Sequence, residues 1–350
     1  MAAYVPDEAF KHVARLLEMT QDPQHQAAAT REVLAKSPSP VFQNAIMAIV
    51  LHGGRCGVSP HVRQSAGLAM KNNLRKYNPQ QRQAVQRLSL MILGDPDKTI
   101  RGLASTMVAH IVRTQGLQSW PQLPPLILRN LQPGSSTHLA SGTLKAMFRI
   151  VEDTGDLIMT FGGDGGGFGD SMTVLLIQYL QHPVADLRVL ALKIIIELVH
   201  QQPLSFEMHL KEMLTALGRL ARDPNVEVQV QVLVAFTNIL DVHHYHDVFQ
   251  SGPTFPHICQ HMMQSCAHGD ERVVQAAISF WGSICYVEDS GIRRIMFSHF
   301  PKLLPFLIRK LEFHPDDPEI GAMDDDWTVP DRCVHAGGRL LSHLPFISSA

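Results

Sequence analysis

A helical phrase recurs along this chain at intervals close to forty residues, and this recurrence limits the folds that the chain can adopt. Each copy begins with a turn or capping residue, often followed by Pro. An aliphatic residue and an Arg or Gln come next, and an Ala-rich apolar stretch completes the phrase. The clearest copies are 59–74, 95–112, 182–199, 223–240 and 269–285. A fixed period of this length indicates stacked helical units that bury their apolar faces against their neighbours.

The spacing between the Arg or Gln positions of successive phrases gives the length of the repeat. In a weaker copy, the residue at the equivalent position is used. With three weaker copies included, the marks are Gln26, Arg63, Arg101, Ala140, Arg188, Gln229, Gln275 and Arg332. Successive marks are 37, 38, 39, 48, 41, 46 and 57 residues apart. The two longest steps predict insertions, namely a Gly-rich inter-repeat segment at 161–170 and an acidic loop at 314–327.

Each phrase has a physical reason to form a helix. The pairs Asp22–Pro23, Ser59–Pro60, Asp95–Pro96 and Asp223–Pro224 predict helix starts, because Asp or Ser accepts hydrogen bonds from first-turn amides and Pro occupies a position whose amide needs no partner. Apolar residues then return every three or four positions, and in 95–112 they predict the core stripe Ile100, Leu103, Ala104, Met107, Val108 and Ile111. Small residues such as Ala66 and Gly67 predict close helix approach.

A second amphipathic helix precedes each phrase, most clearly at 120–131 and 300–311. Two helices per unit of this length are typical of HEAT and armadillo repeats. We therefore predict an all-α fold, a right-handed α-solenoid (superhelix) of about eight HEAT repeats, forming a single domain over residues 1–350. No alternating strand pattern competes with this interpretation.

Composition narrows the function classes. The net charge of −2 gives no basic footprint for nucleic acid, and no run approaches the roughly 20 apolar residues of a membrane span. The five cysteines are scattered without a CxxC pair, as in reduced intracellular proteins. The charged N-terminal stretch does not read as a signal peptide. We expect a soluble protein of the cytosol or nucleus that binds neither nucleic acid nor membrane.

The sequence contains no recognisable catalytic motif. It contains no GxSxG, no HExxH and no phosphate-loop spacing in its glycine run. His243, His244 and His246 lie together without a Cys or carboxylate set at ligand spacing. We expect no enzyme activity, no cofactor and no metal.

The second and third copies of the repeat contain sequence motifs that are specific to one protein family. The run RQSAGLAMKNNLRKY (63–77), then LGDPDKTIRG (93–102) and QGLQSWPQLPPLI (115–127), resembles the amino-terminal region of karyopherin-β (importin-β) nuclear transport receptors, with the importin-β amino-terminal-like region at about 1–77. The resemblance continues through 273–285 and 299–313 to DDDWTVPDRCVHA (324–336), which resembles the acidic loop of the eighth repeat. It covers essentially the whole chain.

The resemblance implies binding and transport. Receptors of this family hold Ran-GTP on the concave face of their amino-terminal repeats and bind Phe-Gly nucleoporins on outer helices, here about 170–267. Carried onto this sequence, the suspected Ran-binding residues are Lys71, Asn72, Asn73, Asp324, Asp325 and Asp326. The resemblance also implies shuttling between cytoplasm and nucleus through the pore, with import cargo bound mostly by later repeats that this chain lacks.

Structural alternatives stand beside these assignments. Arg63, Arg101 and Arg188 are expected to form a structural ladder by bonding carbonyls or acids of adjacent repeats. Residues 71–73 equally suit the capping of a helix end, and 314–327 equally suits a solvated loop. The alternative function is a non-transport HEAT scaffold holding other subunits, for which even spacing is expected. A third class, armadillo enzyme regulators, is expected to present an Asn ladder, which Asn72, Asn73, Asn130 and Asn238 do not form.

Overall fold

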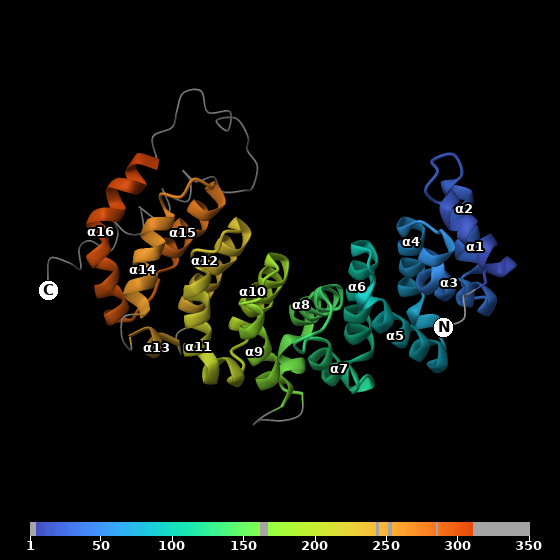
Figure 1. Ribbon diagram of the computed structural model, residues 1–350, viewed down its shortest axis with the longest axis horizontal. Coiled ribbons are helices and arrows are strands. Elements are labelled where there is room, and N and C mark those ends of the chain that lie inside the picture. Colours follow the sequence, from blue (N-terminus) through green and yellow to red (C-terminus); the bar gives the residue numbers. More distant parts are fainter. Residues whose placement is uncertain (1–4, 162–166, 243–244, 251–253, 285, 311–350) are drawn as a thin grey trace. The chain divides into compact units, whose positions relative to one another are not determined.

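The computed structural model describes residues 5–161, 167–242, 245–250, 254–284 and 286–310. Helices are the only regular elements in these residues, so the predicted all-α class is confirmed (Figure 1). The chain divides into two compact units between Phe161 and Gly162, inside the first predicted insertion. The prediction of one continuous solenoid over residues 1–350 stays a prediction.

The described part of the first unit, residues 5–161, contains eight α-helices. They are α1 Glu8–Met19, α2 Gln26–Lys36, α3 Pro40–His52, α4 Pro60–Asn72, α5 Pro79–Met91, α6 Lys98–Gln115, α7 Leu123–Asn130 and α8 Thr137–Met159. Four short 3-10 turns join them: η1 Gly53–Cys56, η2 Leu74–Lys76, η3 Ile92–Gly94 and η4 Leu117–Ser119. Thr154, with φ −154° and ψ 36°, interrupts α8 near its end.

The described part of the second unit also contains eight α-helices. They are α9 Phe168–Tyr179, α10 Ala185–Val199, α11 Leu204–Leu220, α12 Val226–Leu240, α13 His246–Gln250, α14 Thr254–Ser265, α15 Glu271–Ile284 and α16 Ser290–Lys310. The marked residues from Gln26 to Gln275 all fall in the second helix of a pair.

Each unit is built from two layers of helices. In the first unit, α4 packs on α6 and α6 on α8, while α3, α5 and α7 pack behind them. In the second unit, α10, α12 and α15 form the corresponding layer, and α9, α11 and α14 pack behind them. We call these the second-helix layer and the first-helix layer. The predicted core stripe of α6 is confirmed, because its six residues are at most 4% exposed.

The helix starts differ in one respect from the prediction. Ser59 caps α4 as expected, with its hydroxyl accepting from the amide of Val62. The caps of α6 and α12 are instead Asp97 and Asn225. The predicted caps Asp95 and Asp223 each accept the amide two residues on, at 2.9 Å in both cases.

Asp22 follows the same rule, because its carboxylate accepts from the amide of Gln24 while α2 begins at Gln26. The Asp–Pro pair thus makes an Asx turn that precedes the helix. The prediction that these acids are the N-caps was wrong, because the N-cap residue lies two or three positions later in each case.

In two of these turns, a side chain six residues after the Asp hydrogen-bonds to the turn carbonyls. Arg101 donates from one guanidinium nitrogen to the carbonyls of Asp95 and Pro96, at 2.7 and 2.8 Å. Gln229 donates in the same way to the carbonyl of Asp223, at 2.7 Å. In these two phrases the Arg or Gln therefore satisfies turn carbonyls that have no helical partner.

Glycines allow the close approach of helices at two positions. A Cβ added at Gly67 would lie 2.2 Å from a Leu103 methyl carbon, and one added at Gly142 would lie 2.0 Å from the carbonyl oxygen of Leu93. The predicted role of Gly67 is therefore confirmed. At Gly142 the neighbour is backbone, which cannot rotate away.

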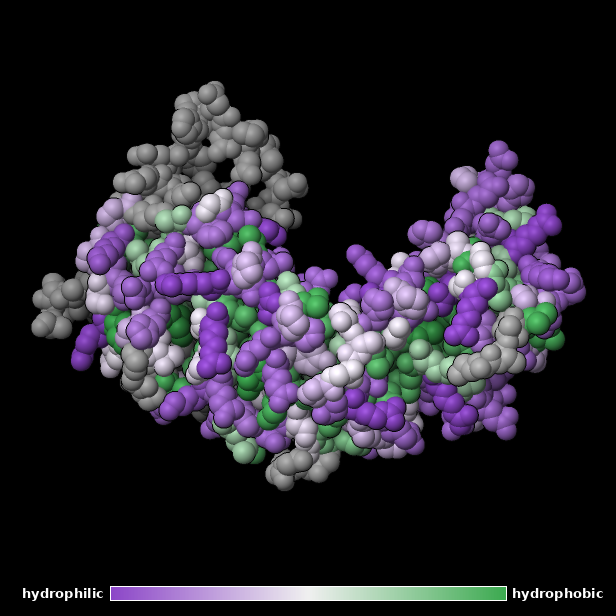
Figure 2. Space-filling model, viewed as in Figure 1, coloured by the Kyte–Doolittle hydropathy of each residue, from purple (hydrophilic) through white to green (hydrophobic). Residues whose placement is uncertain are grey.

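The surface agrees with the layered packing. On the face shown in Figure 2, hydrophilic residues dominate and hydrophobic residues show mainly in the seams between helices. In the part of the chain that the structure describes, no helix combines the length and apolar character needed to cross a membrane.

Candidate functional site

Basic side chains gather in the second-helix layer of the first unit, where α4 and α6 end. Lys71 lies in the last turn of α4, Arg75 in η2, and His110 and Arg113 in the last turns of α6. A guanidinium nitrogen of Arg113 lies 3.4 Å from a ring nitrogen of His110, and another lies 3.9 Å from a carboxylate oxygen of Asp153 in α8. We call Lys71, Arg75, His110 and Arg113 the cationic cluster.

Burial lowers the pKa of His110, and the charges of Lys71, Arg113 and Arg75 lower it further. His110 is therefore neutral at physiological pH, and the positive charge of the cluster resides on the other three side chains. Three cations beside one carboxylate can attract an anionic protein surface, with an affinity that weakens as salt rises.

The predicted string at 71–73 divides between surface and core. Lys71 is half-buried and Asn72 is exposed. Asn73 is 7% exposed, and its amide nitrogen donates to the carbonyl of Ala69 at 2.8 Å. Asn73 therefore takes the capping role that was the alternative for this string, and burial removes it from the accessible surface.

Three further predictions lie outside the described residues. They are the acidic loop with Asp324, Asp325 and Asp326, the weak copy around Arg332, and the His243–His244 pair. Among the residues that are described, no group of His, Cys, Asp and Glu is arranged to hold a metal ion.

Arg63 joins two neighbouring helix pairs. Its guanidinium donates to the carbonyl of Val50 at 2.8 and 3.1 Å, and it lies 2.6 Å from a carboxylate oxygen of Asp95 in the next pair. Both side chains are nearly buried, at 6% and 11% exposure. The contact therefore links α4 to the turn before α6.

Arg188 does the same in the second unit. It donates to the carbonyls of His182 and Pro183, and its second terminal nitrogen lies 2.8 Å from a carboxylate oxygen of Asp223 in the following pair. Arg101 bonds only the carbonyls of its own turn among the contacts described. At the position corresponding to Asp95 and Asp223, the following turn has Gly134 instead of an acid.

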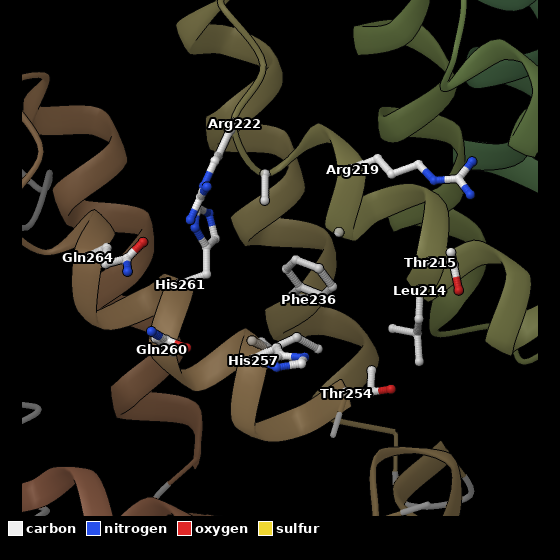
Figure 3. Close-up of a pocket in the computed structure, with 13 residues that line it drawn as sticks. Leu214, Thr215, Arg219, Arg222, Phe236, Thr254, His257, Gln260, His261 and Gln264 are labelled. Carbon is white, nitrogen blue, oxygen red and sulfur yellow. The ribbon is translucent and has the colours of Figure 1, made fainter. Parts of the chain in front are cut away.

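A pocket of about 450 Å³ lies in the second unit between α11, α12 and α14 (Figure 3). Its floor is apolar, formed by the buried side chains of Phe236, Ile258 and Leu214. The volume falls within the range typical of ligand sites.

The rim of the pocket is basic and polar. Arg219, Arg222, His257 and His261 line it together with amide and hydroxyl side chains, and its thirteen described lining residues include no Asp or Glu. Burial first, and then the charge of Arg222, lowers the pKa of His261. The His261 ring is therefore neutral at physiological pH, and the charge of the rim resides on the arginines.

Cys259 lies in α14 between the pocket residues Ile258 and Gln260. The most deeply buried described cysteine is Cys259, and burial raises the pKa of its thiol to about 12. A protonated, enclosed thiol is a poor nucleophile.

The sequence analysis missed most of these surface residues, although a signal for part of the cluster was present. Arg75 and Arg113 each stand twelve positions after the ladder arginine of their own phrase, Arg63 and Arg101. A comparison of polar residues at equal offsets from the marks would have found them. No such register exists for the pocket, whose lining comes from three helices and the turn after α11, between residues 214 and 264.

Curated relatives match nearly the whole chain. It is 23% identical over 338 residues to a transportin from Dictyostelium discoideum, covering 95% of this chain and 35% of the relative. It is 26% identical over 322 residues to an importin subunit beta-2 from Schizosaccharomyces pombe, covering 90% and 34%. No family model matches. The chain spans about a third of the length of these relatives.

Solved structures show the same fold. A Kap95:Nup1 complex superimposes with a TM-score of 0.71 at 14% identity, over 97% of this chain and 44% of that chain. A structure of Kap95p with RanGDP, whose switch loops adopt the GTP-bound conformation on binding, gives 0.72 at 15%, over 97% and 43%. Together with the curated relatives, these matches confirm the resemblance to karyopherin-β proteins of the transportin type.

Proposed function

Because the chain is similar over 90–95% of its length to a transportin and an importin subunit beta-2, we propose that it is a nuclear transport receptor or the amino-terminal portion of one. This similarity is the observation that carries the proposal, and it favours transport over a general scaffold. The chain binds proteins and catalyses no reaction. It shuttles between cytoplasm and nucleus, and most cargo contacts belong to repeats beyond this portion.

The proposed partner of the first unit is Ran-GTP. The supporting observations are the resemblance of 63–77 to the family and the Kap95p complex with RanGDP. The proposed contact is the second-helix layer around the cationic cluster, with Lys71 and Asn72 at its accessible edge. Asp324, Asp325 and Asp326 are proposed to meet basic residues of the same partner.

Binding of the purified chain to Ran loaded with GTP or GDP tests this proposal. We expect tighter binding of the GTP form, and we expect Lys71→Glu with Arg75→Glu to weaken it about tenfold, because like charge would replace complementary charge at an interface. Arg87→Glu, at an exposed position on α5 in the first-helix layer, is the matched control. Equal affinity for both nucleotide states, or equal loss in the control, would refute the assignment.

The acidic residues have a separate readout. Asp324→Asn, Asp325→Asn and Asp326→Asn together should lower the association rate with Ran-GTP and flatten its dependence on salt, because exposed charges act mainly by steering. An unchanged salt slope would return this segment to the solvated-loop interpretation.

The proposed nucleoporin site is the pocket between α11, α12 and α14. Its apolar floor suits the Phe of a Phe-Gly repeat, and it lies within the segment 170–267 that the family resemblance assigned to such repeats. The matching fold of the Kap95:Nup1 complex supports the same proposal.

Filling the pocket tests the assignment without disturbing the core. Gly218 lines the pocket, and a Cβ added there meets nothing within 4 Å. We expect Gly218→Leu to weaken binding of a labelled Phe-Gly peptide at least fivefold, since pocket contacts dominate such binding. Gly102→Leu adds the same side chain at an equally open position of α6 and is the control. Undiminished binding by Gly218→Leu would exclude this pocket.

A further inference from the structure

The pocket between α11, α12 and α14 combines an apolar floor with a basic rim, and this combination restricts its ligand further. A neutral Phe-Gly segment would use only the floor of Phe236, Ile258 and Leu214. It would leave the charge of Arg219 and Arg222 without a counterpart, because no Asp or Glu occurs among the described residues of the lining.

The two arginines are available to a ligand. Both are exposed, and the ion pairs found among the described residues of the second unit involve other basic groups. By contrast, the nearby Arg188 is committed to Asp223. Guanidinium groups bind carboxylates through paired, charge-assisted hydrogen bonds, so a free Arg at a pocket edge favours an acidic ligand group.

Arg222 has the better position of the two. In Figure 3 its guanidinium lies beside the ring of His261 at the α14 side of the pocket, whereas Arg219 extends away from the centre. The effect of the Arg222 charge on the His261 pKa agrees with this proximity. A carboxylate that contacts Arg222 can also accept a hydrogen bond from the neutral imidazole.

Polar side chains at the rim suit a peptide backbone. The amides of Gln260 and Gln264 stand on successive turns of α14, and Thr215 and Thr254 face the other end of the pocket. Amide side chains both donate and accept, so they can pair with an extended peptide whichever way it runs. The pocket therefore offers three kinds of contact, to a ring, to a backbone and to a carboxylate.

We propose that this pocket selects peptide segments in which a Phe is followed or preceded within two residues by Asp or Glu, with Arg222 contacting the carboxylate. The inference rests on the proposed function, because the Phe side chain occupies the same floor. It adds a specificity that the apolar floor alone does not provide, namely a preference among Phe-Gly segments for those flanked by acid.

Three labelled peptides of equal length test the preference on the whole chain by fluorescence anisotropy. They share one Phe-Gly pair and differ in the flanking residue, which is Glu, Gln or Lys. We expect the Glu peptide to bind about fivefold more tightly than the Gln peptide, and the Lys peptide more weakly than both. The difference between Glu and Gln should shrink as salt rises, whereas binding of the Gln peptide should not.

Two variants locate the effect. Arg222→Gln should bring the affinities for the Glu and Gln peptides close together, and Arg219→Gln, its neighbour at the rim, should reduce the difference less. If wild type binds the Glu and Gln peptides equally, or if the preference survives in the double variant, the inference is wrong although the nucleoporin proposal stands. If no peptide binds, both fall.

Discussion

Replacing Asp223 by Ala tests whether the contacts between helix pairs hold the second unit together. The Asp223 carboxylate is 6% exposed and lies 2.8 Å from a guanidinium nitrogen of Arg188, which is 10% exposed. It also accepts the amide of Asn225 at 2.9 Å. The substitution leaves a buried guanidinium without its anion and an amide without its acceptor. Breaking a buried pair from one side costs about 3 to 5 kcal/mol.

Changing the partner as well distinguishes a coupled pair from two independent residues. Arg188→Met with Asp223→Ala removes the stranded charge but leaves the carbonyls of His182 and Pro183 without that donor. The double variant should therefore be destabilised by less than the sum of the two single variants, with a coupling of about 1 to 3 kcal/mol. Independent residues would give a sum.

Hydrogen exchange is the suitable assay, because helical arrays need not unfold in one step. Protection should fall in α10, in α12 and in the turn between α11 and α12. Asp270→Ala is the matched control, since Asp270 pairs with Arg272 at an exposed position, with side chains 29% and 58% exposed. Loss of protection no greater for Asp223→Ala than for Asp270→Ala would refute the reasoning.

Two more predictions concern packing and pH. Gly142→Ala should destabilise the first unit by about 1 to 3 kcal/mol in chemical denaturation, because the new Cβ would meet the carbonyl oxygen of Leu93; Gly218→Ala, at an open helical position, should be neutral or stabilising. A hydrogen bond to Asp170 raises the pKa of His209 above its ordinary 6.5. The raised pKa means that this stabilisation is complete below 6.5 and lost as pH rises through the higher folded value. Protection of α9 and α11 should therefore decline over that range in wild type but not in His209→Gln.

The second helix of each pair was well predicted from the sequence, because each one repeats the same pattern of apolar residues and packs in the same layer. Ile100 and Met107 are buried because the helical period places them on the apolar face of α6, which packs against the neighbouring helices. The caps were predicted less well. Asp95 has the chemistry of a cap, but its contact with Arg63, 32 positions earlier in the chain, and the Asx turn that it forms place it before the helix. The repeat pattern led us to expect that Arg63 bonds a neighbouring repeat, but it did not identify Asp95 as the partner, because that choice depends on how the pairs stack.

The pocket was unpredictable for a related reason. Arg222 lies in the turn after α11, the first helix of one pair, and His261 lies in the first helix of the next. Each looks like an ordinary surface residue in its own helix. Only their approach across the seam makes a basic rim above Phe236, whose own apolar position in α12 predicts burial and nothing more.

The two proposed binding surfaces lie in different layers of different units, so we expect each to bind its partner independently of the other. The cationic cluster belongs to the second-helix layer of the first unit, and the pocket belongs mainly to the first-helix layer of the second. No residue is shared, so substitutions in one should leave the other intact. Gly218→Leu should therefore retain full Ran-GTP affinity, and Lys71→Glu should retain full peptide affinity. If either substitution weakens both Ran-GTP binding and peptide binding, the two surfaces are coupled, and the assignment of one partner to each surface is wrong.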